Sequence, residues 1–153
     1  DLVLCLDMLE HLDHPEKAVE GMFRALRPGG SLVATVPAWP FLFSTHDQAL
    51  GHRRRYRRPG LKKLISSAGF ELRRISYYNA LLFPPIAAVR LLRRGHVDPR
   101  PPDEQEVVES DLKPLPAPIS RLLEETIAVE RYLLRFVSFP FGVSLIAWAK
   151  KPA

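Results

Sequence analysis

Two short apolar runs separated by an amphipathic stretch constrain the fold of this chain more than any other feature of its sequence. Residues 1–6 and 31–36 are continuous runs of the kind that form strands buried on both faces. Between them, residues 14–26 place apolar side chains at helical spacing, namely Ala18, Val19, Met22, Phe23 and Leu26. A strand, a helix and a strand joined by short links form a right-handed crossover between parallel strands. We therefore predict an α/β sheet in which 1–6 and 31–36 are parallel neighbours.

The rest of the chain extends this pattern and divides into three parts. We expect residues 1–78 to form the core, residues 79–141 a partly helical insertion, and residues 142–153 the last core strand and a tail. The predicted elements after residue 37 are a long loop at 38–58, a helix at 59–68, a strand at 70–77, a helix at 79–94 bent or interrupted at Pro84-Pro85, a proline-rich loop at 95–118, a helix at 119–136 and a strand at 143–149. The insertion thus separates the last two strands.

Composition narrows the classes of protein to which the chain can belong. It has 153 residues, of which 46% are hydrophobic and 25% charged, as is typical of one globular domain. The uncharged stretches 75–89 and 136–149 are shorter than the roughly 20 residues of a membrane-spanning helix. A single cysteine, Cys5, excludes an internal disulfide and a CxxC zinc site, and we expect it to be a small buried side chain. Since no secretion leader is visible and the sequence opens inside a core strand, we expect a cytoplasmic protein and a fragment of a longer chain.

The net charge of +5 and the abundance of arginine indicate an anionic partner. Arginine supplies 16 of the 22 basic side chains, and its guanidinium group binds phosphate or carboxylate through paired hydrogen bonds. Five arginines lie between residues 53 and 58. They form a local cluster, whereas a nucleic-acid-binding protein usually carries a basic stripe and an aromatic platform. We therefore expect no nucleic-acid partner, and nucleic-acid binding or modification through residues 52–58 is an alternative function.

The first half of the chain resembles the class I S-adenosylmethionine-dependent methyltransferases, in the branch of small-molecule and quinone-biosynthesis enzymes. The resemblance rests on the first strand followed by Leu9-Glu-His11, on Pro15-Glu-Lys-Ala-Val19, and on Leu26-Arg-Pro-Gly-Gly-Ser-Leu-Val33. It covers residues 1–78 and extends to the last strand. It implies an incomplete Rossmann-like doubly wound sheet, the C-terminal part of that fold, with a helical insertion before the last strand. The last strand would then run antiparallel between 31–36 and 70–77.

The same resemblance implies the cofactor and its contacts. S-adenosylmethionine would bind where the first strand ends, with its methionine end near the backbone of Leu6 and Asp7, and with Met8 and His11 close by. The Gly-x-Gly-x-Gly turn of the family does not occur in this sequence. We therefore expect the full-length protein to be a methyltransferase, and this chain alone to bind the cofactor weakly and to be inactive.

Residues 45–58 carry the densest set of reactive side chains, directly after the carboxyl end of the second strand. Because ligands bind at that edge of an α/β sheet, we predict that this segment is the acceptor-binding and catalytic wall. The candidate catalytic residues are His46 and His52 as alternative bases, Asp47 as the group that orients an imidazole, and Tyr56. The candidate contacts to an anionic acceptor are Arg53 and Arg54. A solvated charged segment is the alternative interpretation.

Other features of the sequence have competing interpretations. His11, Asp13 and His14 have a crude metal-ligand spacing, but the start of a helix accounts for them and we predict no metal site. The apolar beginning of the insertion, residues 77–86, suits a cover over a hydrophobic acceptor or contact with a membrane surface, and packing against the helix at 119–136 is the alternative. The predicted function is methyl transfer to a small molecule, with a non-catalytic methyltransferase-like interaction module as a further alternative. The acceptor and the oligomeric state stay open.

Overall fold

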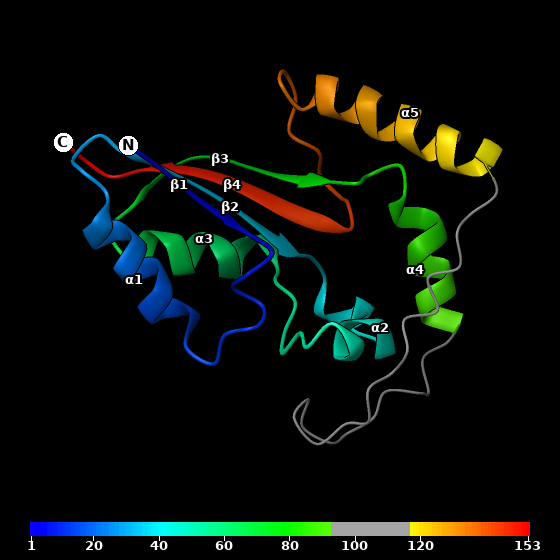
Figure 1. The fold of residues 1–153 in the computed structure, drawn as a ribbon, viewed down its shortest axis with the longest axis horizontal. Helices are drawn as coiled ribbons and strands as arrows, with labels where there is room; N and C mark the ends of the chain where they lie inside the picture. Colours follow the sequence, from blue (N-terminus) through cyan, green and yellow to red (C-terminus); the bar gives the residue numbers. More distant parts are fainter. Residues whose placement is uncertain (93–116) are drawn as a thin grey trace.

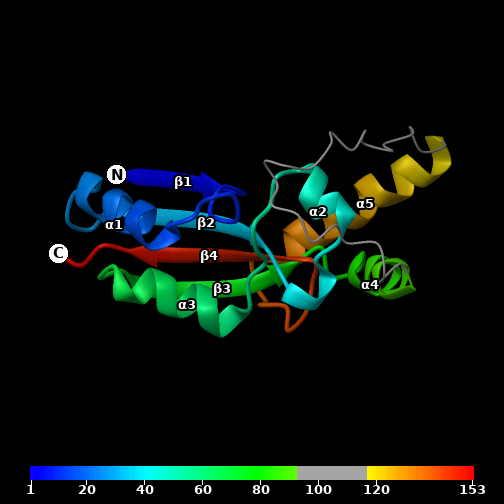
Figure 2. The ribbon, with the colours of Figure 1, turned by 90° about the horizontal axis from the view of Figure 1, so that it is seen from below.

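A four-stranded mixed sheet forms the centre of the molecule. The computed structural model describes residues 1–92 and 117–153. The strands are β1 (Leu2–Leu6), β2 (Ser31–Pro37), β3 (Glu71–Tyr78) and β4 (Ser144–Lys150). Their order in the sheet is β1-β2-β4-β3, which Figure 2 shows from top to bottom. Each predicted strand agrees with the observed one to within a single residue at either end.

The connectivity confirms the α/β arrangement expected from the sequence. β1 and β2 pair in parallel, with Leu4 opposite Val33, and are joined through α1 (Pro15–Ala25). β4 runs antiparallel to both of its neighbours, β2 and β3. Because β3 and β4 are adjacent in the sheet, the helices between them in sequence form an insertion at the carboxyl end of β3 (Figure 1).

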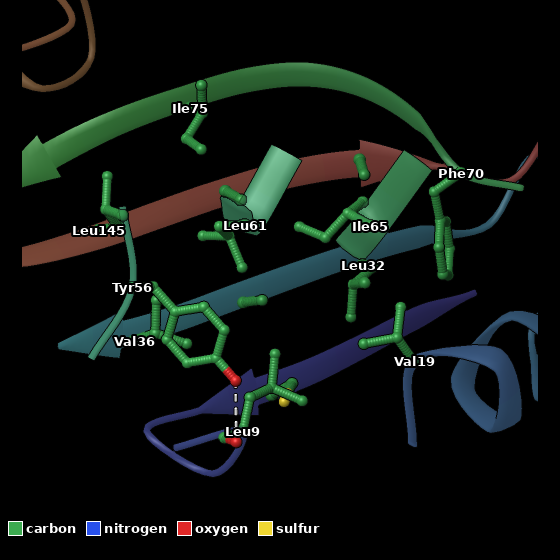
Figure 3. Packing of buried hydrophobic residues seen from close by; sticks show 14 of the residues in the cluster. Leu9, Val19, Leu32, Val36, Tyr56, Leu61, Ile65, Phe70, Ile75 and Leu145 are labelled. Carbon is green, nitrogen blue, oxygen red and sulfur yellow. Dashed lines mark hydrogen bonds between the residues drawn. The ribbon is translucent and has the colours of Figure 1, made fainter. Parts of the chain in front are cut away.

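Two helices cover one face of the sheet and build the core with it. α1 and α3 (Arg58–Ser67) lie below the strands in Figure 1. Each buries a stripe of apolar side chains, since residues three and four apart share one helix face. Val19 of α1 and Leu61 and Ile65 of α3 are at most 1% exposed and pack in one cluster with the strands (Figure 3). The predicted helices at 14–26 and 59–68 are confirmed.

The described residues leave part of the opposite face of the sheet uncovered. Leu2, Leu4 and Leu6 of β1 are all more than half exposed, whereas Cys5 between them is 2% exposed. Successive side chains of a strand point to opposite faces, so the three leucines share the face away from the core. Burial raises the pKa of the Cys5 thiol to about 11, and Cys5 is the small buried side chain expected. β1 is therefore an edge strand with an apolar surface.

The segment between β2 and α3 is not the long loop predicted at 38–58. It contains a short 3-10 helix, η1 (Pro40–Leu42), and a five-residue helix, α2 (Thr45–Ala49). A capping box between Ser44 and Asp47 starts α2. The prediction was wrong here because one and a half helical turns are too short to show apolar periodicity. The Ser-x-x-Asp spacing was the available signal.

The described part of the insertion between β3 and β4 contains two helices, α4 (Phe83–Leu92) and α5 (Ala117–Leu133). The helix predicted at 79–94 begins only at Phe83, so Pro84 and Pro85 occupy the first turn of α4, where backbone N–H groups have no intrahelical partner. The predicted bend or interruption within a helix is therefore wrong. Most of the loop predicted at 95–118 lies outside the described residues. No helix in the described ranges combines the length and the apolar character needed to cross a bilayer.

One buried carboxylate ties α5 to the beginning of the insertion. Glu130 is 4% exposed and accepts hydrogen bonds from the N–H groups of Ala80 (2.8 Å) and Leu81 (3.4 Å). Several apolar side chains on these helices are nevertheless exposed, including Leu92 (88%) and Tyr132 (59%). The insertion is thus anchored at the carboxyl end of β3 and presents apolar side chains outward.

Candidate functional site

The loops that follow β1 and β2 meet at the carboxyl edge of the sheet. Asp7 ends β1 with a φ of +46°, and its N–H donates to the backbone oxygen (3.1 Å) and the Oγ1 (3.0 Å) of Thr35. A positive φ is uncommon for a residue with a Cβ, so the neighbouring strand stabilises this turn. The turn leaves the side chains of Leu6, Asp7 and Met8 exposed at the edge where the sequence places the cofactor.

The chain after α2 returns to the same edge and packs against the loop that follows β1. Ala38 and Tyr56 form a parallel bridge, and the N–H of Arg53 donates to the backbone oxygen of Glu10 (2.9 Å). The Tyr56 hydroxyl donates to the backbone oxygen of Leu9 (3.0 Å), as Figure 3 shows. These contacts bring the segment predicted as the acceptor wall against the segment predicted to hold the cofactor.

Asp47 is the centre of a buried ion-pair network in this region. Its side chain is 0% exposed. Its Oδ1 accepts hydrogen bonds from Nε of Arg55 (2.7 Å) and Nδ1 of His52 (3.0 Å). Its Oδ2 accepts from the N–H of Ser44 (3.0 Å) and Nη1 of Arg90 (3.1 Å). Since Arg90 belongs to α4, this network joins the insertion to the site.

The donors around Asp47 determine its ionisation. Burial acts to raise the pKa of the Asp47 carboxyl, but the His52 hydrogen bond and the charges of Arg55 and Arg90 outweigh it and hold the pKa at about 2. An ionised carboxylate only accepts hydrogen bonds, so Nδ1 of His52 carries the shared hydrogen. In the neutral imidazole, Nε2 of His52 is then left with a free lone pair.

Glu10 lies next to this network, but within the described part of the chain its carboxylate lacks the hydrogen-bond donors that surround Asp47. Its side chain is fully buried, yet no described residue donates a hydrogen bond to either carboxylate oxygen. Nε2 of His52 lies 3.9 Å from Oε1 of Glu10, beyond hydrogen-bonding distance. Burial raises the pKa of Glu10 above its ordinary value of 4.5, and it outweighs the opposing influence of the backbone N–H of Glu10 itself and of the His52 and Arg55 side chains. A buried carboxyl group without a donor is rare in folded proteins.

His11 completes a group of three side chains that we call the Glu10 cluster: Glu10, His11 and His52. The rings of His11 and His52 meet edge to face, with centroids 4.8 Å apart. One ligand atom of each of the three residues lies within 4.8 Å of the other two. Sequence reasoning placed His11 with the cofactor and His52 on the acceptor wall, whereas the folded chain brings them together.

Arg53 and Arg54, the predicted acceptor contacts, are engaged with the loop after β1. Arg53 pairs through Nη1 with Asp13 (2.8 Å) and donates through Nε to the backbone oxygen of His11 (3.1 Å). Arg54 donates to the backbone oxygen of Leu12 (2.9 Å). These contacts hold the two loops together, and a role toward an acceptor stays a prediction for both arginines.

The candidates His46 and Tyr56 differ in their exposure and in their partners. His46 is on the exposed side of α2, and burial, together with the charge of Arg90, lowers its pKa. Among the described residues, the imidazole that Asp47 binds is His52 and not His46. Tyr56 is 9% exposed, and burial raises the pKa of its phenol to about 12, so its hydroxyl remains a donor to the backbone.

The sequence analysis missed three residues of this region, which are Glu10, Arg55 and Arg90. Glu10 was part of the Leu9-Glu-His11 motif but received no role, and its burial has no local signature. Arg55 could not be separated from its four neighbouring arginines by sequence alone. The trio considered for metal binding is divided in the structure, since Asp13 pairs with Arg53 and His14 with Glu16 (3.0 Å).

Comparisons with known proteins agree with this architecture. Residues 1–75 match a family model described as a methyltransferase domain. No curated protein matches the sequence. Among solved structures, an S-adenosylmethionine dependent methyltransferase from Mesorhizobium loti is similar with a TM-score of 0.53 and 12% identity, over 98% of this chain and 61% of the other.

Two further structures show the same fold. A SAM dependent methyltransferase from Archaeoglobus fulgidus has a TM-score of 0.50 and 16% identity, over 99% of this chain and 59% of the other. Phosphoethanolamine N-methyltransferase 2 from Haemonchus contortus, in complex with S-adenosyl-L-methionine, has a TM-score of 0.51 and 16% identity, over 99% of this chain and 33% of the other. The chain thus spans between one third and about three fifths of these three proteins.

Proposed function

We propose, for a chain that has the fold of the class I S-adenosylmethionine-dependent methyltransferases, that its protein transfers a methyl group from S-adenosylmethionine to a small-molecule acceptor. The match of residues 1–75 to a methyltransferase domain and the fold shared with methyltransferases support this proposal. The two loops at the carboxyl edge of β1 and β2 provide its site, because ligands of open α/β sheets bind at that edge.

The residues at the end of β1 fit one side of S-adenosylmethionine. The exposed apolar side chains of Leu6 and Met8 suit the carbon-rich parts of the cofactor, and the exposed carboxylate of Asp7 suits its positive charge. The cofactor, when bound, supplies an electrophilic methyl group. This chain contributes the rigid turn at Asp7, which its hydrogen bonds to Thr35 hold in place. Alignment of the reacting groups is the main protein contribution to such a transfer.

The Glu10 cluster forms the acceptor side of the proposed site. The observation that carries this assignment is the orientation of His52, whose Nδ1 is bound by Asp47 while its Nε2 lies 3.9 Å from Glu10 Oε1, with the His11 ring against its own. The cluster presents oxygen and nitrogen atoms with free lone pairs, and it therefore favours an acceptor group that can give up a proton, such as a hydroxyl. Of the two histidines proposed from the sequence, the geometry favours His52.

The insertion and the two arginines bear on the chemical class of the rest of the acceptor. Exposed apolar side chains of the insertion, such as Leu81 and Val89, favour a hydrophobic acceptor or contact with a lipid surface. An anionic acceptor would draw on Arg53 and Arg54, whose present partners are mostly backbone oxygens. We also propose, from the sequence, that the protein contacts a membrane surface or a lipid-like acceptor, that it has no nucleic-acid partner and that it is cytoplasmic.

The proposal is tested with the full-length protein, tritium-labelled S-adenosylmethionine and a panel of small phenols, alcohols, carboxylates and amines. We expect His52→Ala to lower turnover about 10²–10⁴-fold with cofactor affinity intact. His46→Ala is the matched variant and should keep most of the turnover. Wild-type turnover in His52→Ala would contradict the assignment of the acceptor side. Lack of both cofactor binding and methyl transfer would favour a non-catalytic interaction module.

A further inference from the structure

We propose that Glu10, His11 and His52 form a binding site for a divalent transition-metal ion, with Zn²⁺ as the reference ion. The site itself is inferred from the described side chains and does not depend on the proposed methyl transfer. Two imidazoles and one carboxylate are a donor set that such ions prefer, because borderline metals bind nitrogen and oxygen ligands together. Three protein ligands also leave a coordination position open.

The hydrogen bonds of both histidines select the tautomer that a metal ligand needs. His52 donates from Nδ1 to Asp47, whose carboxylate can only accept. His11 lies with Nδ1 3.2 Å from the backbone oxygen of Gly51, and a carbonyl oxygen also accepts only. In the neutral form of each ring the lone pair is therefore at Nε2. Metal-binding histidines characteristically have their other ring nitrogen bound to a carboxylate or a carbonyl in this way.

Glu10 provides the independent observation that points to a ligand. Its carboxyl group is 0% exposed and neither oxygen receives a hydrogen bond from a described residue. Since an unpartnered buried charge is strongly unfavourable, such a carboxyl group either holds a proton or lies beside a group that supplies positive charge. Nε2 of His52 thus lies 3.9 Å from the Glu10 carboxylate, one ring nitrogen of His11 lies within 4.8 Å of a ligand atom of each of these two residues, and a cation would satisfy all three.

The distances require only a modest contraction. One ligand atom of each residue lies within 4.8 Å of a ligand atom of the other two, and Glu10 Oε1 is 3.9 Å from His52 Nε2. A tetrahedral ion with bonds of about 2.1 Å separates its ligands by about 3.4 Å. His11 is exposed and its ring can approach by side-chain rotation, whereas Glu10 and His52 are held in the interior.

The chemical consequence rests on the proposed function. A metal ion lowers the pKa of an oxygen bound to it. An acceptor hydroxyl at the open position would therefore lose its proton to solvent water more easily, and His52, whose Nε2 would then hold the ion, would be a ligand and not the base. In the absence of methyl transfer, the same residues still form a metal site.

The test uses the full chain, freed of metal with a chelator, and measures Zn²⁺ binding by calorimetry and Co²⁺ binding by visible absorption. We expect one ion per chain and Co²⁺ bands in the visible region that Zn²⁺ displaces. Glu10→Gln and His11→Asn should each lower the affinity at least 10-fold. His14→Asn is the control, because His14 is exposed, lies close in sequence and is outside the cluster. Circular dichroism confirms that each variant is folded.

The outcomes separate this inference from the proposed function. One saturable site that depends on Glu10 and His11 but not on His14 supports the inference, even in a protein without methyl transfer. Absence of saturable Zn²⁺ and Co²⁺ binding, or equal losses in Glu10→Gln and the His14 control, overturns it. Methyl transfer that depends on His52 but is indifferent to chelation and to added Zn²⁺ would leave the proposed function intact and remove the role of the metal in it.

Discussion

Asp47 and Glu10 are two fully buried carboxylates at the same edge of the sheet, on either side of His52, and their surroundings are opposite. Asp47 receives hydrogen bonds from its own capping residue, from His52, and from two arginines, one of them on α4. Glu10 receives none from the described residues. The pKa of Asp47 is accordingly about 2, whereas the pKa of Glu10 is raised.

The difference separates a carboxylate that organises the site from one that is available to bind. Every oxygen of Asp47 is satisfied within the protein, so its removal disturbs structure first. Glu10 is unsatisfied, so its environment changes when a proton or a cation arrives. His52 lies between the two carboxylates, and its hydrogen bond to Asp47 fixes the orientation of the ring nitrogen that lies near Glu10.

The largest expected effect is the loss of Asp47. Asp47→Asn leaves the buried guanidinium groups of Arg55 and Arg90 without their counter-charge, and we expect it to lower the free energy of unfolding by about 3–5 kcal/mol. Urea denaturation of wild type and variant measures this difference. The matched control is Asp13→Asn, whose side chain is 65% exposed and should cost less than about 1 kcal/mol. Similar losses in the two variants would remove the distinction between a buried network and a surface pair.

The second effect is a dependence of stability on acid pH. The pKa of Asp47 is about 2 when folded and 3.8 ordinarily, so its stabilising contribution is complete above about pH 4 and is lost as the pH falls toward 2. The loss amounts to about 2 kcal/mol. Urea titrations at successive pH values should show it in wild type and not in Asp47→Asn. Parallel curves for the two proteins would mean that Asp47 is not ionised through this network.

Glu10 should produce a smaller change of the opposite sign. Because burial raises its pKa above 4.5, the folded state binds the proton more tightly than the unfolded state. In the presence of a chelator, wild type should therefore lose stability relative to Glu10→Gln as the pH rises above 4.5. The difference between the two unfolding free energies, followed up to neutral pH, measures this. A wild type that gains stability over the variant with rising pH would show that Glu10 has an unseen donor.

His46→Ala should have the smallest effect and sharpens the assignment of His52. The His46 side chain is not bonded to Asp47 among the described residues, so its removal should change the free energy of unfolding by less than about 0.5 kcal/mol. Thermal unfolding followed by circular dichroism is sufficient to detect a larger change. A cost comparable with that of Asp47→Asn would place His46 inside the network and reopen the choice between the two histidines.

The sequence indicated which segment, residues 45–58, belongs to the site, but it did not indicate which side chains in it bind one another. The pairing of Asp47 with an imidazole was proposed, but two histidines were equally suitable in the sequence. The arginine that pairs with Asp47 is Arg55, one of a run of similar residues, and the second is Arg90, 43 positions away. The helix α2 was not predicted because its five residues are too few to show an apolar period, although its Ser44–Asp47 cap is a local signal.

The sequence by itself determined the alternation of strands and helices, the parallel pair β1–β2 and the location of the reactive segment after β2. These follow from apolar periodicity, turn residues and the handedness of crossovers, which are properties of short stretches of chain. Only the tertiary structure decided that His52 and not His46 meets Asp47, and that Glu10 is buried beside His11 without a donor. Such contacts depend on how the β1 loop, the segment after α2 and α4 pack together, and residues that meet only after folding leave no pattern along the chain.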